Sequence, residues 1–353
     1  MAVREYSSNL PNTVVMGGGG GGSKTLEALR PNLHEKLTGV VGMIDSGGST
    51  GVIRDVYGGP GWGDLNKNCV ALSQLDDDTL LGLQKKFGEG NQSDGLNVFQ
   101  HSIGNLLLAN YHQQFGGDIE RIVAAYSDLY RTDGRVFPIT GESRQLRLTT
   151  PWGETIYGEH EIDDTEIADL RGSRLWFDQD TQIADQAAGA LDQADLVVLA
   201  PGDWTTSIGP NLVVKGVKER LRRVPAVFAV VNLMNRPAQT RGWGALDYIK
   251  QYEDLLDGEK VIDRVIVNIG PLDPEKLAAQ EAAGSTLVTP DIEELTDAGY
   301  TVVGANLIDP VPPEQDKNDK LTNRTEITHG TLALGRAILL EWFKDQFPDK
   351  SDR

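Results

Sequence analysis

The sequence predicts an α/β fold with a doubly wound, mostly parallel sheet and helices on both of its faces. Near-continuous apolar runs at residues 13–16, 195–200 and 226–231 are typical of strands that are buried on both sides. Segments of helical periodicity separate these runs, so strand and helix alternate along the chain. The first strand, its helix and a second strand at 37–44 fit within about 30 residues, the length of a parallel crossover unit. We therefore expect a single domain over residues 1–353.

The same patterns place the remaining elements. Helices are expected at 24–30, 99–112, 119–130, 176–194, 211–223, 245–256 and 331–347, and further strands at 136–139, 261–268 and 300–307. Alternating side chains and a Pro-Trp-Gly turn within 144–162 indicate antiparallel strands, so a small β-rich insertion is predicted over 135–165. Residues 308–325 are expected to form a loop or linker before the C-terminal helix.

Composition excludes several classes of protein. The formal net charge of −19 argues against nucleic acid and against an anionic membrane surface as partners. Cys69 is the single cysteine of the sequence, so it can form neither an intrachain disulfide nor a cysteine metal cluster. No apolar stretch is long enough to span a membrane, and the first residues lack the apolar core of a signal peptide. A cytoplasmic protein is expected.

Six consecutive glycines, Gly17 to Gly22, follow the first strand and precede a helix that Ser23 could cap. Glycines let the backbone approach an anion, and the free N–H groups and dipole of a helix N-terminus attract phosphate. The alternative is a tight structural turn or a linker. Because linkers do not usually join a buried strand to a helix, we favour a ligand loop. The candidate ligand-binding residues are Gly18, Gly19, Gly20, Gly21, Ser23 and Lys24, although Lys24 could equally be a surface lysine.

Two more small-residue loops follow predicted strands. The strand at 37–44 leads into a loop whose candidate ligand-binding residues are Asp45, Gly47, Gly48, Ser49 and Thr50. The strand at 195–200 leads into a second loop, with candidates Gly202, Asp203, Thr205 and Ser207. Ligands of open α/β sheets bind outside the carboxyl ends of the strands, so we expect both loops to face the glycine run.

Three polar residues outside these loops have both a structural and a functional interpretation. Arg54 could pair with a phosphate or with a nearby acid such as Asp55. Asn68 stands near the start of a predicted helix and is a candidate for polar contacts with a ligand. His101 and Asn105 are one helical turn apart, so they form either a satisfied pair at a helix entry or a pair that faces a ligand.

Generic nucleotide motifs fit the glycine run poorly. A P-loop requires a glycine before its lysine, and Ser23 stands there instead. Gly17, Gly19 and Gly22 satisfy the dinucleotide pattern with Asp45 as the ribose acid, but a homopolymeric run satisfies almost any glycine pattern. A P-loop NTPase and an NAD oxidoreductase therefore remain alternatives.

Several blocks taken together resemble the YvcK/CofD-like family. They are residues 17–30 (GGGGGGSKTLEALR), 44–55 (IDSGGSTGVIRD), 61–73 (GWGDLNKNCVALS), 101–109 (HSIGNLLLA), 135–140 (RVFPIT), 200–219 (APGDWTTSIGPNLVVKGVKE) and 232–240 (NLMNRPAQT). They occur in the order of the family and at about its spacing, and the glycine-serine loop after Asp45 is closer to the YvcK branch.

The resemblance implies a Rossmann-like fold, often dimeric, that binds a nucleotide-containing small molecule. In the YvcK branch this ligand is a UDP-sugar and the role is regulatory, in cell-wall and carbon metabolism. In the CofD branch a Mg²⁺-assisted transferase moves a phospholactate or phosphoenolpyruvate group from a nucleoside diphosphate to a deazaflavin precursor. If a reaction occurs, the resemblance implies Asp45 and Arg54 as its catalytic residues.

Two positions depart from the family pattern. The paired acids of the family appear here as Asp45 and Ser46, and an additional acid, Asp203, stands in the loop at 201–207. Asp203 either alters the choice of ligand or supplies the missing metal ligand, so Asp45 and Asp203 are the candidate Mg²⁺ ligands.

Overall fold

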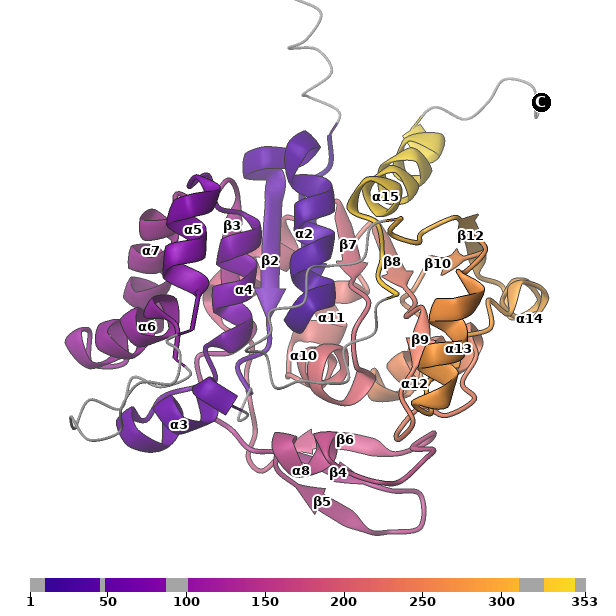
Figure 1. The fold of residues 1–353 in the computed structure, drawn as a ribbon, viewed down its shortest axis with the longest axis horizontal. Helices are drawn as coiled ribbons and strands as arrows, with labels where there is room; N and C mark the ends of the chain where they lie inside the picture. The colour runs from indigo at the N-terminus through magenta and orange to yellow at the C-terminus, as the bar shows by residue number, and fades with distance from the viewer. Residues whose placement is uncertain (1–9, 45–47, 87–100, 311–326, 347–353) are drawn as a thin grey trace, which may run out of the picture.

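The computed structural model describes residues 10–44, 48–86, 101–310 and 327–346. Its centre is a seven-stranded parallel sheet in the order β12-β10-β8-β7-β1-β2-β3 (Figure 1). The strands are β1 (Thr13–Met16), β2 (Leu37–Val41), β3 (Arg135–Pro138), β7 (Leu196–Leu199), β8 (Ala226–Val230), β10 (Arg264–Asn268) and β12 (Thr301–Ala305). The predicted α/β, Rossmann-like class is confirmed.

The strand order reverses between β1 and β7. The chain moves outward from β1 to β2 and β3, returns to β7 on the other side of β1, and continues to β8, β10 and β12. Thr13 accordingly pairs with Leu37 on one side and with Leu196 on the other. The loops that leave β1 and β7 emerge at the same edge of the sheet, on either side of this reversal. Doubly wound sheets bind their ligands in the crevice at such a point.

Helices cover the sheet, and α2 and α15 lie side by side in Figure 1. Gly335 of α15 packs so closely on α2 that a β-carbon there would come within 2.4 Å of the Ala28 carbonyl oxygen. The helices are α2 (Gly19–Leu33), α3 (Gly48–Tyr57), α4 (Gly63–Ala71), α5 (Asp77–Gln84), α6 (Ile103–Gln114), α7 (Ile119–Tyr130), α8 (Glu159–Asp163), α9 (Asp185–Asp192), α10 (Gly209–Leu212), α11 (Val217–Leu221), α12 (Ala245–Leu255), α13 (Pro274–Ala282), α14 (Ile292–Asp297) and α15 (Thr331–Gln346). Side-chain N-caps begin several of them: Asp76 for α5, Ser102 for α6, Asp118 for α7 and Asp273 for α13.

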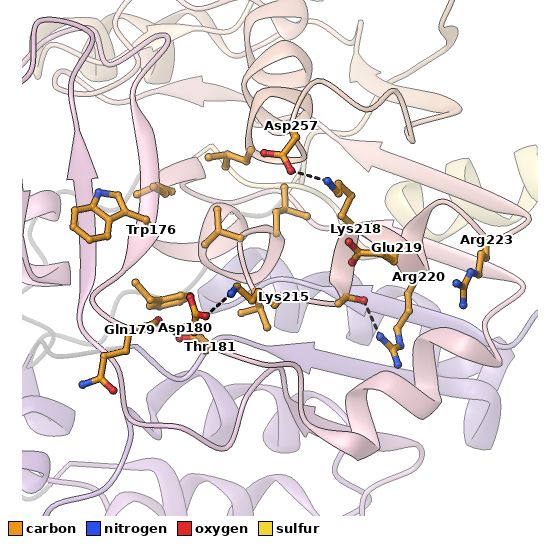
Figure 2. A pocket seen from close by; sticks show the side chains of 17 residues that line it. Trp176, Gln179, Asp180, Thr181, Lys215, Lys218, Glu219, Arg220, Arg223 and Asp257 are labelled. Carbon is orange, nitrogen blue, oxygen red and sulfur yellow. Dashed lines mark hydrogen bonds and ion pairs between the residues drawn. The ribbon is translucent and has the colours of Figure 1, made fainter.

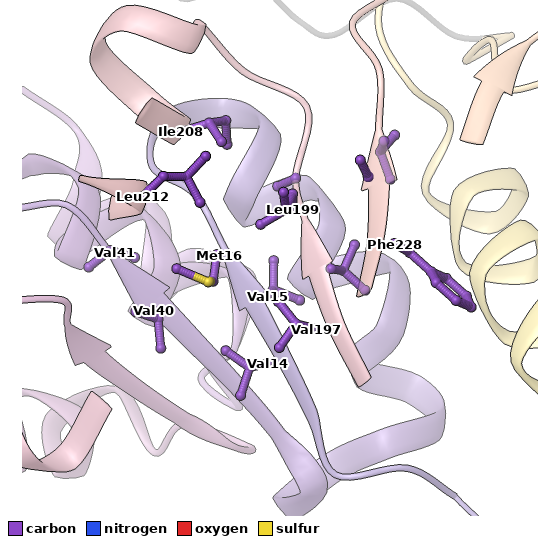
Figure 3. Close-up of a cluster of buried hydrophobic side chains, with 14 of the residues drawn as sticks. Val14, Val15, Met16, Val40, Val41, Val197, Leu199, Ile208, Leu212 and Phe228 are labelled. Carbon is purple, nitrogen blue, oxygen red and sulfur yellow. The ribbon is translucent and has the colours of Figure 1, made fainter. Parts of the chain in front are cut away.

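The core lies on both faces of the central strands (Figure 3). Val14, Met16 and Val197 are at most 2% exposed, as the near-continuous apolar runs predict for parallel strands covered by helices. Burial of a side chain of this size stabilises the fold by roughly 1.5–3 kcal/mol. The core therefore fixes the strand ends from which the loops of the crevice emerge.

A separate three-stranded antiparallel sheet, β5-β4-β6, forms the insertion. Its strands are β4 (Leu146–Thr149), β5 (Thr155–Tyr157) and β6 (Arg174–Phe177). The structure therefore places this sheet within 146–177, whereas residues 135–138 belong to the main sheet. A helix was expected within 176–194, whereas Trp176 and Phe177 belong to β6 and the helix α9 covers Asp185–Asp192. A second small pair joins β9 (Met234–Asn235) to β11 (Thr286–Leu287).

Three expected elements differ in the structure. Helix α2 begins at Gly19 rather than after Ser23, because the glycines themselves form its first turn. Residues 48–57 form α3 where a loop was expected. The predicted helix over 211–223 is divided into α10 and α11 at Gly216, whose φ of 91° interrupts a helix.

Of the expected linker at 308–325, the structure describes residues 308–310, and Ile308 pairs with His329 in an isolated antiparallel bridge. Within the described ranges, no helix combines the length and the apolar character needed to cross a bilayer.

Candidate functional site

The glycine run lies at the reversal of strand order, against the loop that leaves β7. A β-carbon on Gly21 would come within 1.7 Å of the Pro201 carbonyl oxygen, and one on Gly22 within 2.4 Å of the Gly17 carbonyl oxygen. Gly19 has a φ of 63°, which side chains rarely adopt. A β-carbon on Gly20, in contrast, would meet no atom of the described residues within 4 Å. Close packing therefore explains most of the glycines, and Gly20 faces open space.

The first turn of α2 offers unused hydrogen-bond donors. The N–H of Gly17 donates to the Val40 carbonyl and that of Gly22 to Gly18. Among the described residues, the N–H groups of Gly19, Gly20 and Gly21 have no acceptor, as is usual in the first turn of a helix. This turn also carries no acidic side chain. The arrangement suits an anion such as a phosphate.

Ser23 and Lys24 point to other partners. The Ser23 hydroxyl donates to the carbonyls of Gly19 and Gly20, at 3.1 Å in each case, on its own helix. The Lys24 ammonium pairs with Asp309 at 2.9 Å. Both predicted ligand residues therefore have hydrogen-bond or ion-pair partners within the protein.

The loop after β7 continues into a π-helical turn, Trp204–Ile208, a feature that often marks functional sites. The Ser207 hydroxyl lies 3.7 Å from the position of a β-carbon on Gly19, and no group in the described part of the chain bonds to it. Thr205 is fully buried and donates to Gln239 Oε1 at 2.7 Å. The structure therefore brings Ser207 to the glycine turn and directs Thr205 into the core.

Asp203 belongs to an ion cluster that joins the insertion to this loop. One guanidinium nitrogen of Arg236 lies 3.1 Å from the Asp203 carboxylate and also contacts Asp163 at the end of α8. Desolvation raises the pKa of Asp203, although 35% of its side chain remains exposed, and the charge of Arg236 opposes this effect. Asp203 and Asp163 together raise the pKa of Arg236 against its own desolvation. The pair of carboxylates exceeds the single guanidinium by one negative charge.

Asp64 is a site residue that the sequence analysis missed. Its Oδ2 lies only 1.9 Å from the position that a β-carbon on Gly18 would occupy, so the carboxylate rests on the glycine run. Its Oδ1 pairs with Lys67 at 3.3 Å. Asp64 is the acid in the first turn of α4, and its position after the glycine-rich stretch 58–63 was the available signal.

The two predicted asparagines face different surroundings. Asn68 is 1% exposed, and its Nδ2 donates to the Asp64 carbonyl at 2.8 Å. Its Oδ1 has no partner within the described ranges and lies beside Gly22, 3.6 Å from the β-carbon position there. Asn105 instead accepts from Asn66 at 3.1 Å, in a polar network under α4 and α6. The structure therefore brings Asn68 to the glycine run and ties Asn105 to Asn66.

The loop after β2 is described in part. Asp45, Ser46 and Gly47 lie outside the described residues. Gly48 and Ser49 begin α3, in which Thr50 is 6% exposed. Arg54 donates to the carbonyls of Ile44 and Arg144 and to the Ser143 hydroxyl, each at 3.4 Å. Arg54 therefore links α3 to the start of the insertion.

Of the two predicted Mg²⁺ ligands, Asp45 and Asp203, the structure describes only Asp203. Asp203 shares the guanidinium of Arg236 with Asp163. Across the ranges that the structure describes, no three His, Cys, Asp or Glu side chains converge as a metal site would require. Asp64 places a carboxylate oxygen beside Gly18, next to the first turn of α2, and oxygen ligands of this kind together with substrate phosphates suit Mg²⁺.

Comparison with known proteins gives consistent matches over most of the chain. Residues 13–308 match the family described as 2-phospho-L-lactate transferase CofD. A putative gluconeogenesis factor of Aquifex aeolicus is 31% identical over 303 residues, 84% of this chain and 90% of the relative. The gluconeogenesis factor of Bacillus subtilis is 29% identical over 292 residues, 81% of this chain and 89% of the relative. A crystal structure of a Bacillus halodurans protein aligns with a TM-score of 0.82 at 27% identity, covering 93% of this chain and 99% of that protein. A second crystal structure of the same Bacillus halodurans protein is described as that of a member of the UPF0052 family.

Proposed function

The chain belongs to the YvcK/CofD family, and on this basis we propose that it binds a nucleotide-containing ligand, a UDP-sugar, and acts as a regulator of carbon and cell-wall metabolism. The diphosphate would lie at the first turn of α2, and the rest of the ligand would extend between the loops that follow β2 and β7.

The free N–H groups of Gly19 to Gly21 carry this proposal. They stand at the positive end of a helix, the Ser207 hydroxyl lies 3.7 Å from the β-carbon position of Gly19, and no atom of the described residues lies within 4 Å of the β-carbon position of Gly20. A diphosphate has the charge and the acceptor oxygens that such a turn stabilises. The relatives named as gluconeogenesis factors support a role in carbon metabolism.

The state of the other polar groups supports binding rather than conversion of the ligand. Lys24, Thr205 and Arg236 all have protein partners, so they hold the walls of the crevice in place. Fixed walls favour a site that discriminates among ligands by shape and hydrogen bonding.

A transferase is the second candidate, and Asp64 favours it. A carboxylate beside the diphosphate site could help to hold Mg²⁺, which would neutralise charge on a departing nucleotide phosphate. In that case Asn68 and the glycine turn would position the phosphate groups, and a deazaflavin precursor would accept the phospholactate group. Asp45 and Arg54 remain the proposed catalytic residues of this reaction.

A thermal-unfolding series with the full chain tests the proposal. The ligands are UDP-N-acetylglucosamine, UDP, GDP and NAD, each with and without Mg²⁺. A bound UDP-sugar at 100 times its Kd should stabilise the chain by about 2.7 kcal/mol. Stabilisation that requires Mg²⁺ and a nucleoside diphosphate, followed by turnover with a deazaflavin acceptor, would favour the transferase. The absence of stabilisation by every nucleotide would contradict both candidates.

A further inference from the structure

Gln239 is a buried residue in a strained backbone conformation, in the segment that follows β9. The residue is fully buried, and its φ of 72° lies in the left-handed region that residues other than glycine rarely adopt. A conformation of this kind persists only where the surrounding structure holds it, and such residues gather at functional sites. The contacts of Gln239 therefore indicate which parts of the fold the strained residue connects.

Most hydrogen bonds of Gln239 join it to the insertion. Its N–H donates to the Ile167 carbonyl at 2.6 Å, and its carbonyl accepts from the Leu170 N–H at 2.9 Å. Its side-chain Nε2 donates to the Ile162 carbonyl, within α8, at 2.9 Å. These bonds fix both the backbone and the amide of Gln239 on the insertion.

The remaining polar atom of Gln239 reaches the loop after β7. Its Oε1 accepts from the Thr205 hydroxyl at 2.7 Å, and Thr205 is also fully buried. Thr205 is the second residue of the π-helical turn Trp204–Ile208. The N–H of Ser207, two residues later, donates to the Asp203 carbonyl at 2.9 Å. Because one short turn carries both side chains, the bond to Thr205 fixes the direction in which Ser207 projects.

Ser207 is the residue of this turn that lies beside the glycine run. Its hydroxyl is 3.7 Å from the β-carbon position of Gly19, and within the described ranges it has no hydrogen-bond partner. The Ser23 hydroxyl, in contrast, donates to carbonyls of its own helix. A hydroxyl can donate to a phosphate oxygen, so Ser207 can add a donor to those of the glycine turn.

We propose that Gln239 is a positioning residue of the ligand site. It ties the π-helical turn to the insertion through Thr205, so that the Ser207 hydroxyl is already oriented toward a phosphate of the ligand. A donor that is fixed before binding raises affinity because less freedom is lost when the ligand arrives. This inference rests on the proposed function, since it concerns the same crevice.

Calorimetric titration of UDP-N-acetylglucosamine into variants of the full chain tests the proposal. Ser207→Ala should lower the affinity by about tenfold or more, because a hydrogen bond to a charged phosphate is lost. Thr205→Val removes the hydroxyl that Gln239 accepts and should lower the affinity by about fivefold, whereas Thr205→Ser keeps that hydroxyl and should retain the affinity. In the Ser207→Ala background, Thr205→Val should have little further effect, because the residue that it positions no longer acts.

Thr181→Val is the matched control. Thr181 is also buried, and its hydroxyl donates to the Gln179 carbonyl at 3.0 Å. It lines a groove between β6 and the segment from α10 to α11, apart from the glycine run (Figure 2). This variant loses a hydrogen bond of the same kind, so it should lose stability as Thr205→Val does while it keeps the wild-type affinity.

Gln239→Met tests the residue itself and has a readout that needs no ligand. It should lower the affinity as Thr205→Val does, and it should speed hydrogen exchange at the N–H groups of Ser207 and Ile208, which both donate to the Asp203 carbonyl. Unchanged exchange at these two groups would overturn the proposal.

The titrations separate this inference from the proposed function. Additive losses for Ser207→Ala and Thr205→Val would overturn the inference, because independent effects exclude action through Ser207. Wild-type affinity in Ser207→Ala would also overturn it and would leave UDP-sugar binding intact. Absence of binding by the wild-type chain would contradict the proposed function, and the inference with it.

Discussion

The side chain of Asn232 brackets the backbone of Gly202. Its Oδ1 accepts the Gly202 N–H at 2.7 Å, and its Nδ2 donates to the Gly202 carbonyl at 3.0 Å. Asn232, which follows β8, thus pairs with both backbone polar groups of Gly202 in the loop after β7, as a neighbouring strand would. The Gly202 N–H is therefore occupied, and the free backbone donors that face the crevice come from the first turn of α2.

Asn232→Ala should loosen this loop. Loss of both hydrogen bonds leaves partly buried backbone groups unpaired, and we expect a destabilisation of about 1–3 kcal/mol by chemical denaturation. Asn232→Asp keeps the acceptor but places a carboxylate against the Gly202 carbonyl, so it should be no more stable than the alanine variant. If Asn232→Asp retained wild-type stability, the donor bond to the carbonyl would contribute nothing.

The variant Gly20→Ala tests the proposed phosphate site separately from the stability of the fold. Among the described residues, a methyl group at Gly20 meets no atom within 4 Å, and alanine favours helix over glycine by up to about 1 kcal/mol, so the variant should be as stable as wild type or more stable. The same methyl group lies where the diphosphate would approach, so UDP-sugar affinity should fall by about tenfold or more.

The matched control for this prediction is Gly82→Ala in α5. Gly82 also has open space around its β-carbon position, so the same change should affect stability similarly and leave ligand affinity unaltered. Isothermal titration calorimetry on both variants makes the comparison. Equal affinities for Gly20→Ala and wild type would place the diphosphate elsewhere.

Local sequence patterns predicted the strands and the position of the glycine run, because buried parallel strands and helix-starting glycines leave continuous signals in the chain. They did not predict the partners within the crevice. Arg236 reaches Asp163 across 73 positions and Asp203 across 33, and such contacts have no periodicity to detect. Thr205 was assigned to the crevice with Ser207, but the π-helical turn rotates it toward Gln239. The glycine run itself misled the placement of the helix start, because glycine is normally a poor helix residue.

Arg236→Met should destabilise the junction between the insertion and the loop after β7. The change leaves Asp203 and Asp163 close together without their shared cation, and we expect a loss of about 1–2 kcal/mol near neutral pH, reduced by the partial exposure of all three side chains. A raised pKa in the folded state means that the folded protein binds a proton more tightly than the unfolded chain. The cost of the Asp203 charge therefore grows as the pH rises, and acidification should recover part of the lost stability.

Urea denaturation at several pH values between 5 and 8 checks this prediction. Arg236→Met combined with Asp203→Asn removes the repulsion and should be more stable than the single variant. A loss that is independent of pH, and that Asp203→Asn does not reduce, would assign the role of Arg236 to packing alone.

His329 should make the protein sensitive to mild acid. The ring is buried beside the carbonyl of Val231, and within the described ranges its Nε2 has no partner. Burial lowers the pKa of His329 to about 4, with the Lys24 charge acting in the same direction. The unfolded chain then binds the proton more tightly than the folded protein, so the contribution of His329 to stability is complete above about pH 6.5 and is lost as the pH falls toward 4.

His329→Gln removes this dependence, and the difference in unfolding free energy between wild type and variant should narrow as the pH is lowered from 7 to 4.5. His160→Gln, at a side chain that is 62% exposed, serves as the control, and its difference from wild type should change little. A difference for His329→Gln that is constant over this range would show that the pKa of His329 is the same in the folded and the unfolded chain, and would contradict the prediction.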